Sequence, residues 1–251
     1  MGFFTLLPYV IIMAMRLNLY ISTSGYCSRR KADLLIKEGK VKVDNKVVTE
    51  PWFNVEDGSS VRAEGKPLKG EDRVYLVFNK PKGVTTTLSD KFAEKKITDF
   101  LPKSLGRVYP VGRLDKLSRG LLILTNDGDL CYRLSHPKFE IEKEYVVLVK
   151  GRPNGSIDRE LKNGVQCGED FLKVKSAHIE KIDQDKFSVR TVICEGKKRH
   201  LRRLFESLGL KVLDLRRIRV GPFNLGDLKE GSFRIIDKQA ELGWLAKNNK
   251  K

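Results

Sequence analysis

The earliest regular pattern of apolar and polar positions along the chain is helical and lies in residues 16–38. Apolar side chains three and four positions apart predict a short helix over residues 16–24 and a second over 29–38, each with one buried face. Ser28 is suited to cap the start of the second helix, and Gly39 is suited to end it. We therefore expect two short helices joined by a tight turn.

A period of two follows these helices. Residues 41–43 and 46–48 alternate apolar and polar side chains on either side of Asp44 and Asn45, so this segment predicts a β-hairpin. A further short strand is expected around residues 60–62. Residues 16–65 are therefore expected to fold as one small module of helices and strands.

Strand patterns dominate the rest of the chain. The segment 201–208 has helical spacing, and a short helix is expected over 129–135, capped by Asp129 and ended before Pro137. Because strands outnumber helices and lack regular βαβ spacing, the pattern predicts an α+β fold with a mixed, mainly antiparallel sheet. The predicted strands are residues 74–78, 108–111, 121–124, 145–149, 189–194 and 215–221.

The domain boundaries follow from the segments without such patterns. Residues 66–73 are polar and contain proline and glycine, which is typical of a linker. The larger domain is therefore expected over residues 74–237. The last residues, 238–251, are expected to be a basic tail.

An apolar leader, residues 1–15, precedes the first helix. It is too short for a membrane span and is interrupted by Pro8, and it lacks the basic start of a signal peptide. We expect this leader to be untranslated or dispensable, with Met15 or Met13 as the true start.

The net charge indicates the kind of partner. The 251 residues include 49 Lys+Arg and 32 Asp+Glu, which gives a formal net charge of +17. Such an excess favours a polyanionic partner, most simply nucleic acid. Residues 195–219 alone contain nine basic and three acidic residues, interleaved with apolar residues, so this cluster is expected on a folded surface. A basic protein that binds a membrane surface is the weaker alternative.

The four cysteines and three histidines are scattered along the sequence. No Cys-x-x-Cys pair and no other metal-ligand spacing is present, so the sequence indicates no metal site. Reduced thiols in the cytoplasm are the default for such cysteines. Gly196-Lys197 is not part of a phosphate-binding P-loop, because the upstream glycine is missing.

One loop carries the clearest candidate chemistry. Gly112-Arg113-Leu114-Asp115-Lys116 places a carboxylate between two cations, directly before the apolar strand 121–124. A loop held by a rigid strand is where functional residues are commonly found. An isolated aspartate in a loop is more often solvated or a helix cap, so the loop alone does not assign a role to Asp115.

The whole stretch from Gly112 to Gly128 resembles the catalytic motif of the bacterial RsuA/RluB-like pseudouridine synthases, which modify ribosomal RNA. The resemblance implies that Asp115 is the essential catalytic residue for isomerising uridine to pseudouridine, as a nucleophile or as the base of a glycal-type route. It also implies that the target uridine leaves its stack to be reached. The reaction is an isomerisation, so no cofactor is expected.

Two further elements of the chain resemble family motifs. Tyr145 lies in a Lys-x-Tyr-x-Val context, where the family has an active-site tyrosine that stacks on the base. Lys197 follows a glycine just before a predicted helix, where a cation and backbone N–H groups can bind an anion. The family pairs a basic residue of this element with its aspartate, so the resemblance implies that role for Lys197. His200 departs from the family pattern, which usually has glutamine there.

RNA-binding residues are expected in both domains. The segment from Arg16 to Ala32 resembles the alpha-L RNA-binding domain, and three cations at a helix N-terminus oppose the helix dipole, which favours a phosphate-binding role over helix stability. Arg113, beside the catalytic loop, is the candidate to fill the place of the flipped uridine. The residues predicted to bind RNA are Arg29, Arg30, Lys31, Lys80, Lys116, Lys198, Arg199, Arg202, Arg203 and Arg217.

The sequence leaves a second function class open. The charge and the alpha-L-like module suit a non-catalytic ribosome-assembly factor equally well, but such a factor has no need of Asp115, Tyr145 and Lys197 together. As the target we expect 23S rRNA of the large subunit first, with 16S rRNA and tRNA as alternatives. We expect a cytoplasmic monomer.

Overall fold

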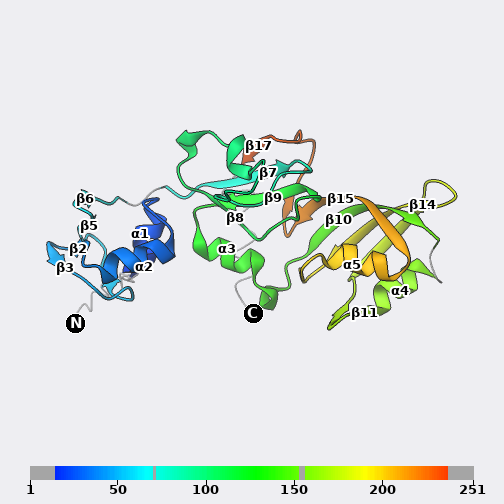
Figure 1. Cartoon of the computed structure of the whole chain (residues 1–251), viewed down its shortest axis with the longest axis horizontal. Coiled ribbons are helices and arrows are strands. Elements are labelled where there is room, and N and C mark those ends of the chain that lie inside the picture. The colour runs from blue at the N-terminus through cyan, green and yellow to red at the C-terminus, as the bar shows by residue number, and fades with distance from the viewer. Residues whose placement is uncertain (1–14, 70–71, 153–155, 237–251) are drawn as a thin grey trace, which may run out of the picture. The chain divides into compact units, whose positions relative to one another are not determined.

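The computed structural model describes residues 15–69, 72–152 and 156–236. The chain divides into two compact units, residues 1–73 and 74–251, and each has its own hydrophobic core (Figure 1). The expected leader, apart from Met15, and the expected basic tail lie outside the described residues. Among the helices in the described part of the chain, none is long and apolar enough to cross a membrane.

The first unit packs two helices against small antiparallel sheets. Its elements are β1 (Met15–Arg16), α1 (Leu17–Thr23), α2 (Arg29–Lys37), β2 (Val41–Val43), β3 (Lys46–Val47), β4 (Asn54–Val55), β5 (Val61–Ala63) and β6 (Lys66–Pro67). Strands β3, β2, β5 and β6 form one sheet, and β1 pairs with β4. Both predicted helices and the predicted hairpin are confirmed. The expected linker starts too early, because β6 adds residues 66–67 to the sheet.

A nine-stranded sheet forms the second unit. Its elements are β7 (Tyr75–Lys80), η1 (Ile97–Phe100), η2 (Lys103–Leu105), β8 (Tyr109–Pro110), β9 (Arg119–Thr125), α3 (Gly128–Ser135), η3 (Pro137–Phe139), β10 (Lys143–Gly151), α4 (Ile157–Asn163), β11 (Val165–Cys167), β12 (Asp170–Leu172), β13 (Ser176–Lys181), β14 (Lys186–Ile193), α5 (His200–Ser207), β15 (Leu210–Val220), β16 (Phe223–Asn224) and β17 (Phe233–Ile235). Strands β11 and β12 form a separate hairpin.

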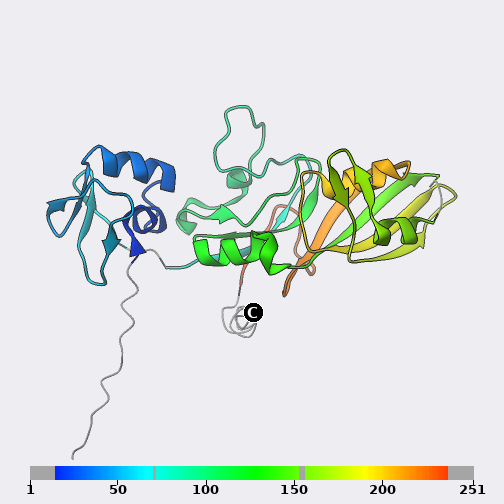
Figure 2. The ribbon, with the colours of Figure 1, turned by 90° about the horizontal axis from the view of Figure 1, so that it is seen from below.

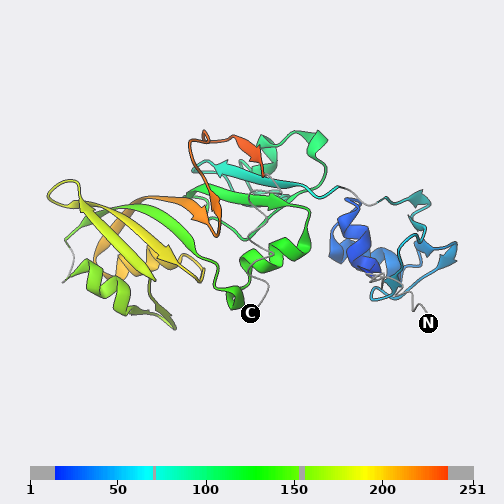
Figure 3. The same cartoon turned by 180° about the vertical axis from the view of Figure 1, so that it is seen from behind.

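The sheet order is β13-β14-β10-β15-β9-β7-β17, with β8 and β16 paired to β9 and β15. Every pairing is antiparallel except that of β9 with β15, which is parallel. The mixed, mainly antiparallel sheet is therefore confirmed. Strand β17, near the end of the described chain, lies beside β7, near the start of the unit (Figure 3).

Three helices pack against this sheet. Leu130 and Leu134 of α3 pack with Leu121 and Ile123 of β9, and α4 and α5 pack against the part of the sheet that contains β10 and β14 (Figure 2). The expected helix over 129–135 is present. Its cap is Asp127, because that side chain accepts bonds from the N–H groups of residues 129 and 130. The prediction of Asp129 as the cap is wrong.

A β-bulge divides the cations of β15 between the two faces of the sheet. The register of β10 and β15 shifts between Glu144 and Tyr145, so that Glu144 faces Arg219 and Tyr145 faces Arg217. Ile218 is the extra residue. An extra residue reverses the alternation of side chains, so Arg217 and Arg219 lie on opposite faces of the sheet although they are two residues apart.

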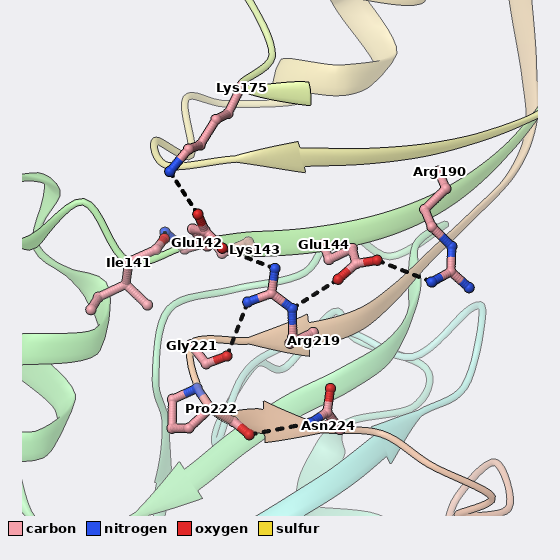
Figure 4. Close-up of polar contacts among 10 residues, drawn as sticks. All are labelled: Ile141, Glu142, Lys143, Glu144, Lys175, Arg190, Arg219, Gly221, Pro222 and Asn224. Atoms are coloured by element: carbon pink, nitrogen blue, oxygen red, sulfur yellow. Dashed lines mark hydrogen bonds and ion pairs between the residues drawn. The ribbon is translucent and has the colours of Figure 1, made fainter. Parts of the chain in front are cut away.

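The face that carries Arg219 holds a chain of ion pairs (Figure 4). The Arg219 guanidinium binds Glu142 at 3.0 Å and Glu144 at 2.8 Å. Lys175 adds a 2.7 Å pair to Glu142, and Arg190 adds a 3.3 Å pair to Glu144. Arg219 therefore joins β10 to β15 at the centre of this network.

Replacing Arg219 by alanine is expected to lower the free energy of unfolding by about 1–2 kcal/mol, because it leaves Glu144, whose side chain is only 15% exposed, with a weaker partner. Arg190→Ala is the matched control. Its side chain is 61% exposed, so its loss is expected to cost less than about 0.5 kcal/mol. Chemical denaturation measures both, and equal losses would contradict this account of the network.

Candidate active site

The second unit contains a cavity of about 890 Å³. Its walls come from five segments of the sequence: the loop 111–118, the end of α3, strand β10, residues 195–202 and strand β15. The sheet brings β10 and β15 together, and the loop leads directly into β9, the parallel neighbour of β15. Asp115, Tyr145, Lys197 and Arg113, the four residues predicted to be catalytic, all line this cavity.

The loop that carries Asp115 is held by backbone hydrogen bonds. The Thr86 hydroxyl bonds both backbone groups of Leu114, donating to its carbonyl oxygen at 2.7 Å and accepting from its N–H at 3.3 Å. The Gly83 N–H donates to the Lys116 carbonyl oxygen at 2.8 Å. Leu114 itself is buried, whereas Asp115 is exposed. The chain therefore anchors the loop on both sides of Asp115 and leaves its carboxylate accessible.

Tyr145 and Lys143 lie on the same face of β10 and both line the cavity. Tyr145 is 7% exposed, so it forms part of the wall. The Lys143 ammonium donates to the carbonyl oxygens of Ile141 at 3.1 Å and Cys194 at 3.4 Å. Burial, together with the charge of Arg217, lowers the pKa of Lys143. The sequence analysis missed Lys143, although the period of two from Tyr145 places it on the same face.

Arg202, on α5, is the cation that the fold brings toward the Asp115 loop. It is 6% exposed, and its Nη2 donates to the Leu117 carbonyl oxygen at 2.9 Å. Burial lowers the pKa of this guanidinium, the charge of Arg199 lowers it further, and the charge of Asp115 raises it. Arg202 was expected to bind RNA backbone, but its place in the wall favours a role toward Asp115.

Lys197 has a different partner from the predicted one. Its ammonium lies 3.3 Å from a carboxylate oxygen of Asp170 and donates to the Phe171 carbonyl oxygen at 3.2 Å. The helix α5 begins only at residue 200, with Arg199 as its N-cap, so Lys197 precedes the helix entrance. The prediction that Lys197 pairs with Asp115 is therefore wrong.

Two predicted RNA-binding residues are structural instead. Arg203 donates to Asp170 at 2.7 Å and to the Cys167 carbonyl oxygen, so it joins α5 to the β11–β12 hairpin. Lys80 is fully buried, and its ammonium donates to the carbonyl oxygens of Pro81 at 2.8 Å and Val84 at 2.7 Å. Lys80 is therefore not accessible to an RNA phosphate, whereas the Arg203 side chain is 29% exposed.

The other predicted cations divide between the cavity and the surface. Arg113, Lys198 and Arg199 are exposed at the cavity, and Arg217 is buried in its wall with its Nε donating to the Leu121 carbonyl oxygen at 2.7 Å. Lys116 is exposed but does not line the cavity. Arg29, Arg30 and Lys31 are exposed on the first turn of α2, which Ser28 caps as predicted.

Three residues of the cavity wall hold a buried polar atom with no hydrogen-bond partner among the described residues: Ser118 Oγ, His200 Nδ1 and Arg202 Nε. A carboxylate oxygen of Glu195 lies 3.7 Å from His200 Nδ1. Burying a polar atom without a hydrogen bond is unfavourable. No group of three or more His, Cys, Asp and Glu side chains within the described ranges is arranged to hold a metal ion.

Lys80 gives a pH-dependent prediction. Burial lowers its pKa to about 8, against attraction from Asp115 and Glu230. Between pH 8 and the ordinary value of 10.5, the unfolded chain binds a proton here that the folded chain does not. The free energy of unfolding of the parent should therefore rise relative to Lys80→Met by up to about 1.4 kcal/mol per pH unit. Below pH 8 the difference should be constant.

Denaturation of both proteins from pH 7 to 10.5 measures this difference. Lys82→Met is the matched control, because Lys82 is exposed and its removal should give a curve parallel to that of the parent. A parallel curve for Lys80→Met as well would show that Lys80 keeps its proton in the folded protein.

Comparison with known proteins adds the family to this geometry. Residues 74–207 match the model of the RNA pseudouridylate synthase family, and residues 15–61 match the S4 domain, another name for the alpha-L domain. "Ribosomal large subunit pseudouridine synthase B" of Bacillus subtilis (strain 168) is 40% identical over 223 residues, 88% of this chain and 91% of the relative.

Two further similarities agree with this match. An uncharacterized RNA pseudouridine synthase of Aquifex aeolicus (strain VF5) is 37% identical over 94% of this chain and 95% of its own length. A solved pseudouridylate synthase superposes with a TM-score of 0.60 at 26% identity, covering 90% of this chain and 97% of that chain. The chain therefore belongs to the RNA pseudouridylate synthase family and carries an S4 domain at the start of its described part.

Proposed function

We propose that this protein isomerises uridine to pseudouridine in ribosomal RNA, first in the 23S rRNA of the large subunit, and that Asp115 is its catalytic residue. The observation that carries the proposal is the composition of the cavity. It is lined by the exposed Asp115 carboxylate, by the buried side chain of Tyr145 and by two buried arginines, Arg202 and Arg217. Its volume is within the range of small-molecule sites, which suits a single flipped nucleotide. The printed name of the Bacillus relative supports the large-subunit target.

The chemistry needs a carboxylate that can reach the ribose. The bond between C1′ of the ribose and N1 of uracil breaks, the uracil turns, and C1′ bonds to C5. The C5 hydrogen leaves as a proton, and N1 takes up a proton, so the isomer has the same atoms as uridine. Asp115 acts on the ribose, as the nucleophile at C1′ or as the base that starts a glycal route. No atom is gained and no electron is lost overall, so the substrate supplies everything the product contains.

Three side chains support this step. Arg202 holds a positive charge close to the Asp115 loop, so it attracts the Asp115 carboxylate. Tyr145 stacks on the uracil and keeps it in the site while it turns, and its hydroxyl is available to accept a proton. Arg113, exposed at the cavity, fills the position that the flipped uridine leaves in the RNA.

The remaining cations hold the RNA. Lys143 and Arg217 give the wall a positive charge that suits the phosphate of the flipped nucleotide. Arg29, Arg30 and Lys31 of the S4 domain bind RNA backbone, which positions the enzyme without reading sequence. We infer that the protein acts as a monomer. We expect it in the cytoplasm with its ribosomal substrate.

Tritium release from RNA labelled at uridine C5 tests this function. The C5 hydrogen is lost only when C5 becomes the glycosidic carbon. The parent protein is expected to release tritium from 23S rRNA, and release from 16S rRNA or tRNA alone would move the target to that RNA. An absence of release from all three, tested also with ribosomal subunits from cells lacking the gene, would contradict the proposed function.

A further inference from the structure

A cluster of aromatic side chains lies at the end of α3, next to the cavity. Tyr132, on α3, and Phe139, on η3, meet edge to face with ring centroids 5.5 Å apart. The His136 ring lies between the two elements, 4.9 Å from Tyr132 and 6.4 Å from Phe139. The only other aromatic pair among the described residues, Phe78 with Phe100, lies in the core.

The cluster is exposed although its rings are apolar. Tyr132 is 47% and Phe139 is 37% exposed, and His136 is exposed as well. Large aromatic rings normally stabilise a protein by being buried. Three rings in contact at the surface therefore indicate a binding surface rather than packing.

The local structure fixes the cluster in place. Leu130 and Leu134 bury the opposite side of α3 against the sheet. The His136 side chain accepts the Lys138 N–H at 3.2 Å and so caps η3. The rings are therefore presented by a rigid turn and not by a free loop.

This turn also borders the cavity. Leu134, Ser135 and Pro137 line the cavity wall, and they alternate with the cluster residues in the sequence. RNA that delivers a uridine to Asp115 is therefore within reach of this turn. The Lys138 ammonium lies over the Tyr132 ring, 5.0 Å from its centroid, and over the Phe139 ring, 4.8 Å from its centroid.

We propose that Tyr132, His136 and Phe139, with Lys138 over two of their rings, form a stacking platform for an unpaired base of the substrate RNA that neighbours the target uridine. This proposal rests on the proposed function. Flat aromatic faces bind bases of any sequence by stacking, and a cation next to them suits the phosphate of the same nucleotide. A positive charge favours RNA over an apolar protein partner.

The first test measures stacking without using catalysis. The probe is a nine-nucleotide single-stranded RNA, all uridine except for 2-aminopurine at its centre, whose fluorescence falls when the base stacks. The parent should quench it on binding. A Tyr132→Leu and Phe139→Leu double variant, which keeps apolar bulk but removes the aromatic rings, should bind about tenfold more weakly. The Tyr132→Phe and Phe139→Tyr double variant should bind like the parent.

The second test separates binding from chemistry. In tritium release from C5-labelled 23S rRNA, the double leucine variant should raise KM about tenfold and leave kcat within about twofold. Phe92→Ala is the matched control, because Phe92 is 98% exposed and outside the cluster; it should change neither value. Unchanged melting temperatures exclude unfolding as the cause.

Two outcomes would overturn the platform. One is a double leucine variant that binds the oligonucleotide and the rRNA as tightly as the parent. The other is a loss seen only with ribosomal subunits and not with naked RNA, which would make the partner a protein. A parent that quenches the probe but releases no tritium would leave the platform standing and contradict the proposed function.

Discussion

An Asp115→Asn variant is expected to lose at least about 1000-fold of the isomerisation rate while its affinity for rRNA changes less than about threefold. Asparagine fills the same space, but it supplies no anion to attack C1′ or to take a proton. Asp115 is exposed in the cavity, so the change disturbs no packed side chain. Single-turnover tritium release gives the rate, and filter binding gives the affinity.

Asp129→Asn is the matched control for this variant. Asp129 is also an exposed aspartate, but it lies in the first turn of α3 and does not line the cavity. Its rate should stay within about threefold of the parent. If both variants kept the parental rate, Asp115 would not carry the reaction, and if both lost RNA binding, a general loss of structure would be the cause.

A Gly120→Ala variant is expected to lose more than about 3 kcal/mol of folding stability. Gly120 has a φ of +103°, and an added Cβ would lie 2.2 Å from the Arg217 carbonyl oxygen and 2.8 Å from its backbone nitrogen. Both atoms belong to β15, which pairs in parallel with β9 at this residue. Backbone atoms in the middle of a sheet cannot move aside, so the two strands must separate.

Gly226→Ala is the control that measures the cost of a positive φ without a steric clash. Gly226 also has a positive φ, +57°, but nothing lies within 4 Å of its added Cβ, so its change is expected to cost only about 1 kcal/mol. Denaturant unfolding compares the two. Equal losses would mean that the close contact of β9 with β15 is not what requires glycine at position 120.

The elements that depend on local sequence were predictable. Helical spacing and the Ser28 cap predicted α2, and the apolar run 121–124 predicted the buried strand β9. The parallel pairing of β9 with β15 was not predictable, because it joins residues about 100 positions apart. The Asp127 cap was missed because two neighbouring aspartates compete for one helix start, and only the folded backbone selects between them.

In the candidate site, too, some features could be predicted from local sequence and others depend on the folded chain. Asp115 was identified from its motif and Tyr145 from its strand context. The structure shows both residues lining one cavity. The sequence could not show that Arg202 is turned toward the Asp115 loop while its neighbour Arg203 is turned toward Asp170. Adjacent residues of a helix point in different directions, and only the packing of α5 against the rest of the domain decides which of the two faces the cavity.

The most direct test of the central claim is to count pseudouridine itself. Ribosomal RNA from cells lacking the gene is incubated with the parent protein or with Asp115→Asn, digested to nucleosides and separated by chromatography. One new pseudouridine per rRNA molecule is expected with the parent and none with the variant. Tight binding of the rRNA by the parent without any new pseudouridine would contradict the proposed function and would favour a ribosome-assembly factor.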